Sequence, residues 1–403
     1  MNNILKRAII YSIGNYSSKL ISVLIFPIVV TYLGLVDTGR FDLVFSTVNV
    51  LVIIFSLQIG DAVYRWFNTK DEKEQQISFS NSVILITIMI VIVTIIYLIL
   101  YFFYTDLITF LSISYFILIS QIILSLYLQV IRGVGNINVY TAVGIIKSIV
   151  FSLGSLLVVV YTTSKLQNVL LMALVANIVS IVIVMSQVNS SLYFNKSCVN
   201  LSNSLKLVKY SAPLILNAFS WVSFFTINKY IILFYFGVEN NGMFAIAEKV
   251  TTGIFFCGMF YYFSVQDYCL SSPNFKKEII FFKNIMYKVV LITSIVVFMA
   301  IVSSWLVLTF YLEEFGDFLK FFPCLAIANL FIILANYLGI PYNYMKETFS
   351  MALTSFFGAV ISVLFSMTFS LVFGVFSIGV SILIGAIYVF IMRFRYSVRF
   401  FNS

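Results

Sequence analysis

Long apolar segments, separated by polar or Gly/Pro clusters, run through almost the whole of this chain. Each is close to the roughly 20 predominantly apolar residues that a helix needs to cross a bilayer. Hydrophobic residues make up 62% of the sequence and charged residues 10%, against roughly 45–50% and about 25% in soluble domains. Strict alternation of apolar and polar residues is absent, which favours helices over a barrel. Twelve spans are predicted, at residues 8–33, 42–64, 78–104, 110–131, 140–161, 169–187, 207–236, 242–264, 284–311, 319–341, 348–371 and 377–393.

The longest loop between the spans, at about residues 188–206, divides them into six before and six after. We therefore predict an all-α integral membrane protein of two six-helix lobes, residues 1–195 and 207–403. A cytoplasmic linker at residues 196–206 joins them, and a basic cytoplasmic tail ends the second lobe. Because each lobe has an even number of spans, the lobes share one orientation and are related by an axis along the membrane normal.

A short internal repeat supports this duplication. YLGLVDTGRF at Tyr32–Phe41 returns as YFGVENNGMF at Tyr235–Phe244, with Tyr, two Gly and Phe at one constant offset. Both copies fall in the predicted turn between the first and second helix of a lobe. Repeat-built transporters often hold substrate at the interface between repeats, so the pattern indicates transport.

The Lys/Arg bias of the short loops sets the predicted orientation. The loops on the opposite side of the bilayer hold three basic residues, Arg40, Lys165 and Lys320. The side that contains both termini collects many more, and is therefore the cytoplasmic side: Lys6, Arg7, Arg65, Lys70, Lys73, Arg132, Lys196, Lys206, Lys209, Lys276, Lys277, Lys283, Lys346, Arg393, Arg395 and Arg399.

Several chemistries are excluded by what the sequence lacks. It has no histidine, which excludes His-based acid/base catalysis and imidazole metal sites, and no phosphate-binding loop of the GxxxxGK[ST] type. The four cysteines show no CxxC spacing and are expected to act as small apolar side chains. The net charge of +9 is spread over loops on one face of a bilayer, so we expect contact with anionic lipid rather than with nucleic acid. No metal or cofactor is predicted.

Charged and polar residues inside predicted spans are costly and usually face a bundle interior or a water-filled cavity. Lys19 lies near the middle of the first span. Asn15, Ser18 and Ser22 recur beside it at helical spacing. We interpret this stripe as lining a polar lumen; helix–helix packing by Asn and Ser is the alternative.

The seventh span repeats the theme with Asn217, Ser220 and Asn228 on one face. Lys229 follows toward the outer end of that span, where it would either contact substrate or extend to the lipid headgroups.

Glu248 and Lys249 are adjacent in the eighth span. Neighbouring helical residues point about 100° apart, so each charge needs a partner on another helix. Two readings stay open: a lumen cation beside a carboxylate that titrates during coupling, or a structural interhelical pair.

Lys147 and Lys288 enter the fifth and ninth spans from the cytoplasmic side, and either line the lumen or extend to the headgroups. Asp61 and Arg65, four residues apart, are expected to form a salt bridge that is either structural or part of a gate. The five lysines within spans outnumber the deep acids, and this surplus predicts an anionic substrate.

Two segments carry a resemblance to a known family. TYLGLVDTGRFDLVFSTVNVLVIIFSLQIGDAVYRWF, with its Gly-Asp-Ala-x-x-Arg pattern, and SAPLILNAFSWVSFFTINKYIILFYFGVENNGMFAIAEKV resemble polysaccharide transporters of the multidrug/oligosaccharidyl-lipid/polysaccharide exporter (MOP) superfamily. Among these, the chain is most similar to O-antigen (Wzx-type) flippases.

The resemblance implies a bacterial inner-membrane flippase for an undecaprenyl-diphosphate-linked oligosaccharide, working by alternating access around a cationic cavity. Proton or sodium coupling and contact with other glycan-export machinery are part of that expectation. Lys19 and Lys249 are the expected principal anion contacts. By the internal offset Lys19 corresponds to Val222, so the cationic residues are not symmetric.

Two alternatives remain. A multidrug exporter of the same superfamily would need acidic cavity residues for cationic drugs, which the surplus of lysines disfavours. A membrane glycan polymerase or ligase would be an enzyme with a sizeable outer loop, whereas the outer loops here are short.

Overall fold

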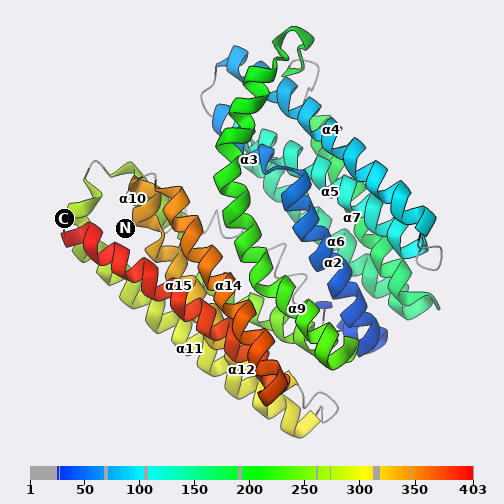
Figure 1. The fold of residues 1–403 in the computed structure, drawn as a ribbon, viewed down its shortest axis with the longest axis vertical. Helices are drawn as coiled ribbons and strands as arrows, with labels where there is room; N and C mark the ends of the chain where they lie inside the picture. The colour runs from blue at the N-terminus through cyan, green and yellow to red at the C-terminus, as the bar shows by residue number, and fades with distance from the viewer. Residues whose placement is uncertain are drawn as a thin grey trace. The chain divides into compact units, whose positions relative to one another are not determined.

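A computed structural model describes residues 25–26, 28–67, 71–103, 108–188, 193–259, 262–272, 274–311, 318–345 and 347–402. The regular secondary structure in these ranges is entirely helical, and turns and short connections join the helices. The helices, labelled as in Figure 1, are α2 (Leu35–Phe55), α3 (Ile59–Phe67), α4 (Glu72–Phe103), α5 (Ile108–Val134), α6 (Ile137–Tyr161), α7 (Lys165–Gln187), α9 (Leu201–Gly258), α10 (Tyr262–Ser271), α11 (Ile279–Tyr311), α12 (Phe318–Leu338), α13 (Ile340–Met345), α14 (Thr348–Phe373) and α15 (Phe376–Asn402), with short 3₁₀ turns at Lys196–Cys198 and Phe275–Glu278.

Within the described residues, ten helical segments are long and apolar enough to cross a membrane. One of them, α9, contains the seventh predicted span and most of the eighth, which was predicted to run to residue 264. The first predicted span, residues 8–33, lies mostly outside the described residues. The all-α membrane fold class is confirmed.

The described residues form two compact units. The N-unit comprises residues 25–33 and 44–219, and the C-unit comprises residues 34–43 and 220–402, within the described ranges. The units therefore differ from the predicted lobes at two places: residues 34–43 pack with the C-unit, and the first turns of α9 pack with the N-unit.

The C-unit has its centre where α12, α14 and α15 pack together (Figure 1). Small residues line the contact between α14 and α15, and a Cβ on Gly385 would lie 2.6 Å from the Gly358 carbonyl oxygen. Close backbone approach of this kind is how membrane helices gain van der Waals contact without a hydrophobic driving force. Phe224 of α9 and Phe321 of α12 fill the surrounding core.

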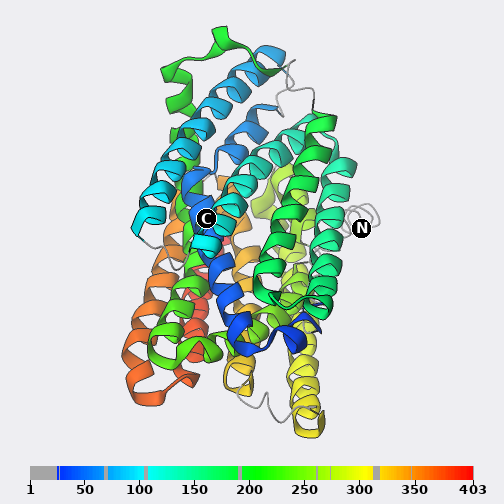
Figure 2. The same ribbon diagram turned by 90° about the vertical axis from the view of Figure 1, so that its right-hand side faces the viewer.

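The N-unit is built from α5, α6 and α7, with α3 and α4 packed on α5 (Figure 2). The segment before α9 is held to α4 by Asn81, which is fully buried. Its amide nitrogen donates to the carbonyl of Cys198 at 3.0 Å, and its oxygen accepts from the Asn200 backbone N–H and the Ser204 hydroxyl, each at 3.0 Å. The predicted linker is thus a fixed segment in the structure.

The two repeat segments have the same backbone geometry. Gly34 and Gly237 adopt positive φ angles of 84° and 85°, a conformation that glycine reaches at low cost. The chain bends at each glycine and a helix resumes directly afterwards. The predicted turns are therefore sharp bends, and the second and eighth spans begin before the predicted residues 42 and 242.

Within the C-unit the two repeat segments also pack against each other. A Cβ on Gly39 would overlap the carbonyl oxygen of Val238, and one on Gly242 would overlap that of Leu35. Asn241 donates to the Gly39 carbonyl at 3.0 Å. The two repeat segments therefore form a helix crossing, where Gly39 and Gly242 each allow the backbone of the other segment to approach closely.

Two predicted helix limits are wrong. The span predicted at residues 42–64 is interrupted between α2 and α3, where Leu57 and Gln58 have φ angles of 50° and 49°, a left-handed conformation that is strained for such residues. The last helix, α15, continues to Asn402, past the predicted end at residue 393, because its C-terminal turns bury Arg393, Ser397 and Phe400.

Candidate functional site

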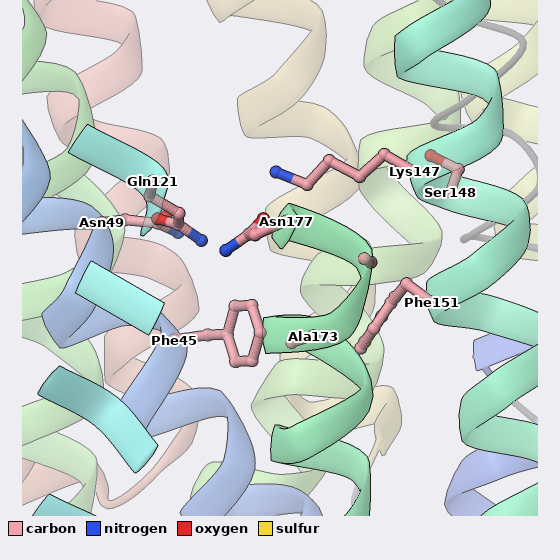
Figure 3. A pocket seen from close by; sticks show the side chains of 9 residues that line it. Phe45, Asn49, Gln121, Lys147, Ser148, Phe151, Ala173 and Asn177 are labelled. Atoms are coloured by element: carbon pink, nitrogen blue, oxygen red, sulfur yellow. The ribbon is translucent and has the colours of Figure 1, made fainter. Parts of the chain in front are cut away.

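A pocket of about 180 Å³ with both polar and apolar wall residues lies between helices of the N-unit (Figure 3), and one of its wall residues, Asn49, is exposed. Its polar wall residues come from four different helices, so the site exists only in the folded bundle. The residues that line it are Phe45, Asn49, Gln121, Lys147, Ser148, Phe151, Ala173, Ala176 and Asn177.

Lys147 supplies the charge of this cavity. It extends from α6 toward the side where Asn49 and Gln121 lie (Figure 3), and it is half-buried. The other lining residues are neutral, and among the described residues no carboxylate forms an ion pair with Lys147. An ammonium held in a low-dielectric bundle without a counter-charge attracts an anion strongly.

The neutral part of the wall combines amides with aromatic rings. Asn177 is buried and its amide nitrogen donates to Ser120 at 2.9 Å, which fixes the orientation of the side chain. The rings of Phe45 and Phe151 pack at a tilt of 44°, with their centroids 6.1 Å apart. Amides that donate and accept hydrogen bonds, next to apolar rings, suit a ligand with hydroxyls on a carbon ring.

The sequence prediction included Lys147 but missed Asn49, Gln121 and Asn177. A signal was present, since each is an amide inside a predominantly apolar span. Their convergence depends on how α2, α5 and α7 pack, which spacing within one helix does not reveal.

Lys229 has a different environment, because two carboxylates neutralise it. Its ammonium lies 2.9 Å from Asp42 Oδ2 and 2.5 Å from Glu248 Oε2, and its side chain is 4% exposed. All three residues belong to the C-unit. We call them the carboxylate–lysine cluster. The structure places Lys229 in this cluster rather than at the lipid headgroups.

Glu248 therefore pairs with Lys229, on the arm of α9 before Gly237, and not with the adjacent Lys249. The partner of Glu248 therefore lies across the bend at Gly237 within α9, and a partner of Lys249 on another helix stays a prediction. Lys249 is half-buried on α9, and Lys288 is exposed on α11.

The predicted salt bridge between Asp61 and Arg65 is wrong. The described residues show no ion pair between them. Instead Gln129 donates to Asp61 at 2.8 Å, and the Arg65 guanidinium lies over the ring of Tyr210 at 4.6 Å. Interhelical contacts have replaced the local pair, because both side chains reach neighbouring helices from α3.

Part of the polar stripe of the seventh span holds two helices together. Asn228 is fully buried, donates to Ser362 at 3.1 Å and accepts from Ser366, so it ties α9 to α14. Ser220 is buried and Asn217 half-buried on the same helix. Lys19, Asn15, Ser18 and Ser22 lie outside the described residues.

Arg393 was assigned to a cytoplasmic loop, and the structure corrects this. Its side chain is 1% exposed within α15. The guanidinium donates to Thr354 at 3.1 Å, to the Ala335 carbonyl at 3.1 Å and to Ser355 at 2.7 Å. It thus joins α12, α14 and α15, and does not contact lipid headgroups.

A multi-pass helical bundle with an internal repeat and a polar cavity has the architecture of a membrane transporter. Solved structures with the same fold include a multidrug resistance MATE family transporter of the MOP superfamily in an inward-facing conformation, at 14% identity and a TM-score of 0.74, covering 98% of each chain. A MATE structure in the straight conformation matches at 16% identity and a TM-score of 0.70, covering 99% of this chain and 95% of that chain. A MOP superfamily transporter from Pyrococcus furiosus, described as having a binding pocket of reverse polarity, matches at 16% identity and a TM-score of 0.63 over the same shares.

The sequence itself matches the family described as polysaccharide biosynthesis protein over residues 4–259. The chain belongs to this family. No curated protein gives a significant match. The resemblance to polysaccharide transporters of the MOP superfamily is thereby confirmed, and the protein is a multi-pass membrane protein with a transporter fold.

Proposed function

We propose that this protein is a flippase that moves an undecaprenyl-diphosphate-linked oligosaccharide, an O-antigen unit or a similar repeat unit, across the bacterial inner membrane by alternating access. Three facts support the proposal: the polysaccharide biosynthesis family, the transporter fold, and a polar cavity inside a membrane-spanning bundle. The lipid tail would stay in the bilayer while the protein accommodates the polar head.

The observation that carries the proposal is the charge of the cavity in the N-unit. Lys147 is the ionisable residue of its wall, whereas Asp42 and Glu248 are both occupied by Lys229. A cavity with one cation and several amides suits an anionic glycan. It repels the organic cations that a multidrug exporter would bind.

The multidrug exporter is kept as the second candidate because solved structures that share the fold include MATE transporters. It predicts uptake of organic cations by vesicles that contain the purified protein. The glycan polymerase or ligase is the third reading, and it predicts polymer formation by the purified protein.

Diphosphate binding is assigned to Lys19 and Lys249, as the sequence predicts. Lys249 is half-buried on α9, and a lysine there can supply a mobile point charge for phosphate oxygens. Coupling to protons or sodium also remains part of the proposal, with Glu248 as its expected carboxylate.

Replacing Lys147 by Gln is expected to reduce transport at least tenfold without unfolding the protein. The variant removes the charge of the cavity and keeps a long polar side chain, and a tenfold loss corresponds to about 1.4 kcal/mol. Surface glycan would be measured in a deletion strain that carries the variant gene, together with the amount of inserted protein. Lys288→Gln, which alters an exposed lysine on α11, is the matched control; wild-type surface glycan in the Lys147→Gln strain would contradict the assignment.

The proposed orientation, with both termini in the cytoplasm, predicts one-sided labelling of Cys198. This cysteine is half-exposed in the 3₁₀ turn before α9. Cys269 is buried, and burial together with nearby Glu278 raises the pKa of its thiol to about 12, so it stays protonated and unreactive at neutral pH.

A membrane-impermeant maleimide should therefore label the protein in inverted vesicles and not in spheroplasts. Because Cys257 on α9 is also exposed, both experiments use Cys257→Ser protein, and adding Cys198→Ser should then remove the labelling. Labelling of Cys198 from outside intact spheroplasts would reverse the orientation.

The function is tested by deleting the gene in its native host. The proposal predicts that lipid-linked oligosaccharide units accumulate on the cytoplasmic side while the surface polymer disappears. Unchanged surface polymer in a strain with no redundant transporter would overturn it.

A further inference from the structure

The N-unit cavity carries information about the glycan itself. Its wall has one ammonium, that of Lys147, and otherwise neutral side chains. One half-buried cation balances one negative charge, and a second negative charge would be left without a partner in this site. A ligand with a single negative charge fits this wall better than a diphosphate does.

The volume of the pocket indicates how much of a ligand it can hold. An apolar cavity of about 150 Å³ admits benzene, so a cavity of about 180 Å³ holds one six-membered ring. An oligosaccharide would place one of its sugars there and leave the others outside.

The arrangement of side chains matches a sugar ring. Asn49, Gln121 and Asn177 converge on the same space as the Lys147 ammonium (Figure 3). Phe45 lies on another side of the space and packs its ring against that of Phe151, so this part of the wall is apolar. Amide groups donate to and accept from hydroxyls, and the ammonium pairs with a carboxylate.

We propose that this cavity binds one acidic sugar residue, with its carboxylate on Lys147 and its hydroxyls on the amides of Asn49, Gln121 and Asn177. The inference deepens the proposed function and rests on it: the transported glycan carries a uronic acid or a similar carboxylate sugar. The diphosphate of the lipid carrier binds elsewhere.

Binding of simple glycosides to the purified full-length protein tests the site directly. The probes are methyl glucuronide, methyl glucoside and inorganic pyrophosphate, and the readout is isothermal titration calorimetry, which gives a Kd for each probe. We expect the glucuronide to bind at least tenfold more tightly than the glucoside. Equal binding of the two glycosides, or binding of pyrophosphate alone, would overturn the proposal.

Variants locate the binding within the cavity. Lys147→Gln should remove the preference for the glucuronide, and Lys288→Gln should keep it. Gln121→Glu places a carboxylate in the cavity near the Lys147 ammonium, so it should abolish glucuronide binding while leaving the lysine in place. A preference that survives both cavity variants would assign the carboxylate to another site.

Transport in vesicles separates this inference from the proposed function. Lipid-linked oligosaccharides with and without a uronic acid would be compared in proteoliposomes. Faster translocation of the acidic glycan supports both proposals. Equal translocation of the two glycans would refute the inference and leave the flippase assignment standing. Translocation of neither glycan would refute the flippase assignment, and the inference would then be decided by the glucuronide binding experiment.

Discussion

Lys229→Met is expected to destabilise the protein by about 3–5 kcal/mol, the usual cost of removing one partner from a buried ion pair. The side chain is 4% exposed and lies within 3 Å of a carboxylate oxygen of both Asp42 and Glu248. Without the ammonium, two carboxylates would remain in the C-unit with no cation between them. The thermal unfolding midpoint in detergent, together with the yield of monodisperse protein, measures this effect.

A compensated variant separates charge from packing. The triple change Asp42→Asn, Lys229→Met and Glu248→Gln removes all three charges, and replacing a complete buried ion cluster is often nearly neutral. We therefore expect the triple variant to recover most of the stability that Lys229→Met loses. An unfolding midpoint of Lys229→Met equal to that of the wild type would show that the cluster does not stabilise the fold.

Gly39→Ala and Gly242→Ala are each expected to destabilise the protein by about 1–3 kcal/mol, the usual cost of overpacking. In each case the new Cβ would overlap a backbone carbonyl oxygen of the other repeat segment, which no side-chain rotation can relieve. The two helices would have to separate. Thermal unfolding in detergent would report the loss.

Gly154→Ala is the matched control, because it also adds a methyl group to a helical glycine. Its Cβ would lie 2.8 Å from the sulfur of Met172, and a flexible methionine can move aside. We expect a smaller effect there. If Gly39→Ala and Gly242→Ala behave like Gly154→Ala, the crossing is not a close backbone contact.

The helical architecture was predictable because it depends on local composition. Each span could be predicted from the length of its apolar segment. The bends of the repeat segments could be predicted from their glycines, since Gly34 and Gly237 both have positive φ angles, which glycine adopts most easily. The strained break at Leu57 and Gln58 was not predictable, because these residues carry no local signal for a left-handed conformation.

The charged contacts were harder to predict because they join distant parts of the chain. Asp42 and Lys229 are 187 residues apart in sequence, and only the crossing of the repeat segments brings them together. Arg393 looked like a loop cation because it is the last residue of the last predicted span, and helix packing buries it instead. The cavity in the N-unit was partly predictable, since Lys147 was recognised as an intramembrane cation while its three amide neighbours were not.

Protein-dependent movement of a lipid-linked oligosaccharide across a sealed bilayer tests the central proposal most directly. The purified protein would be reconstituted with undecaprenyl-diphosphate-linked oligosaccharide, and the fraction of glycan accessible to a membrane-impermeant oxidant would be followed over time. The account predicts that this fraction rises faster with the wild-type protein than in empty vesicles, and that Lys147→Gln removes most of the increase. Translocation no faster than in empty vesicles, with uptake of an organic cation by the same vesicles, would contradict the account and favour a multidrug exporter.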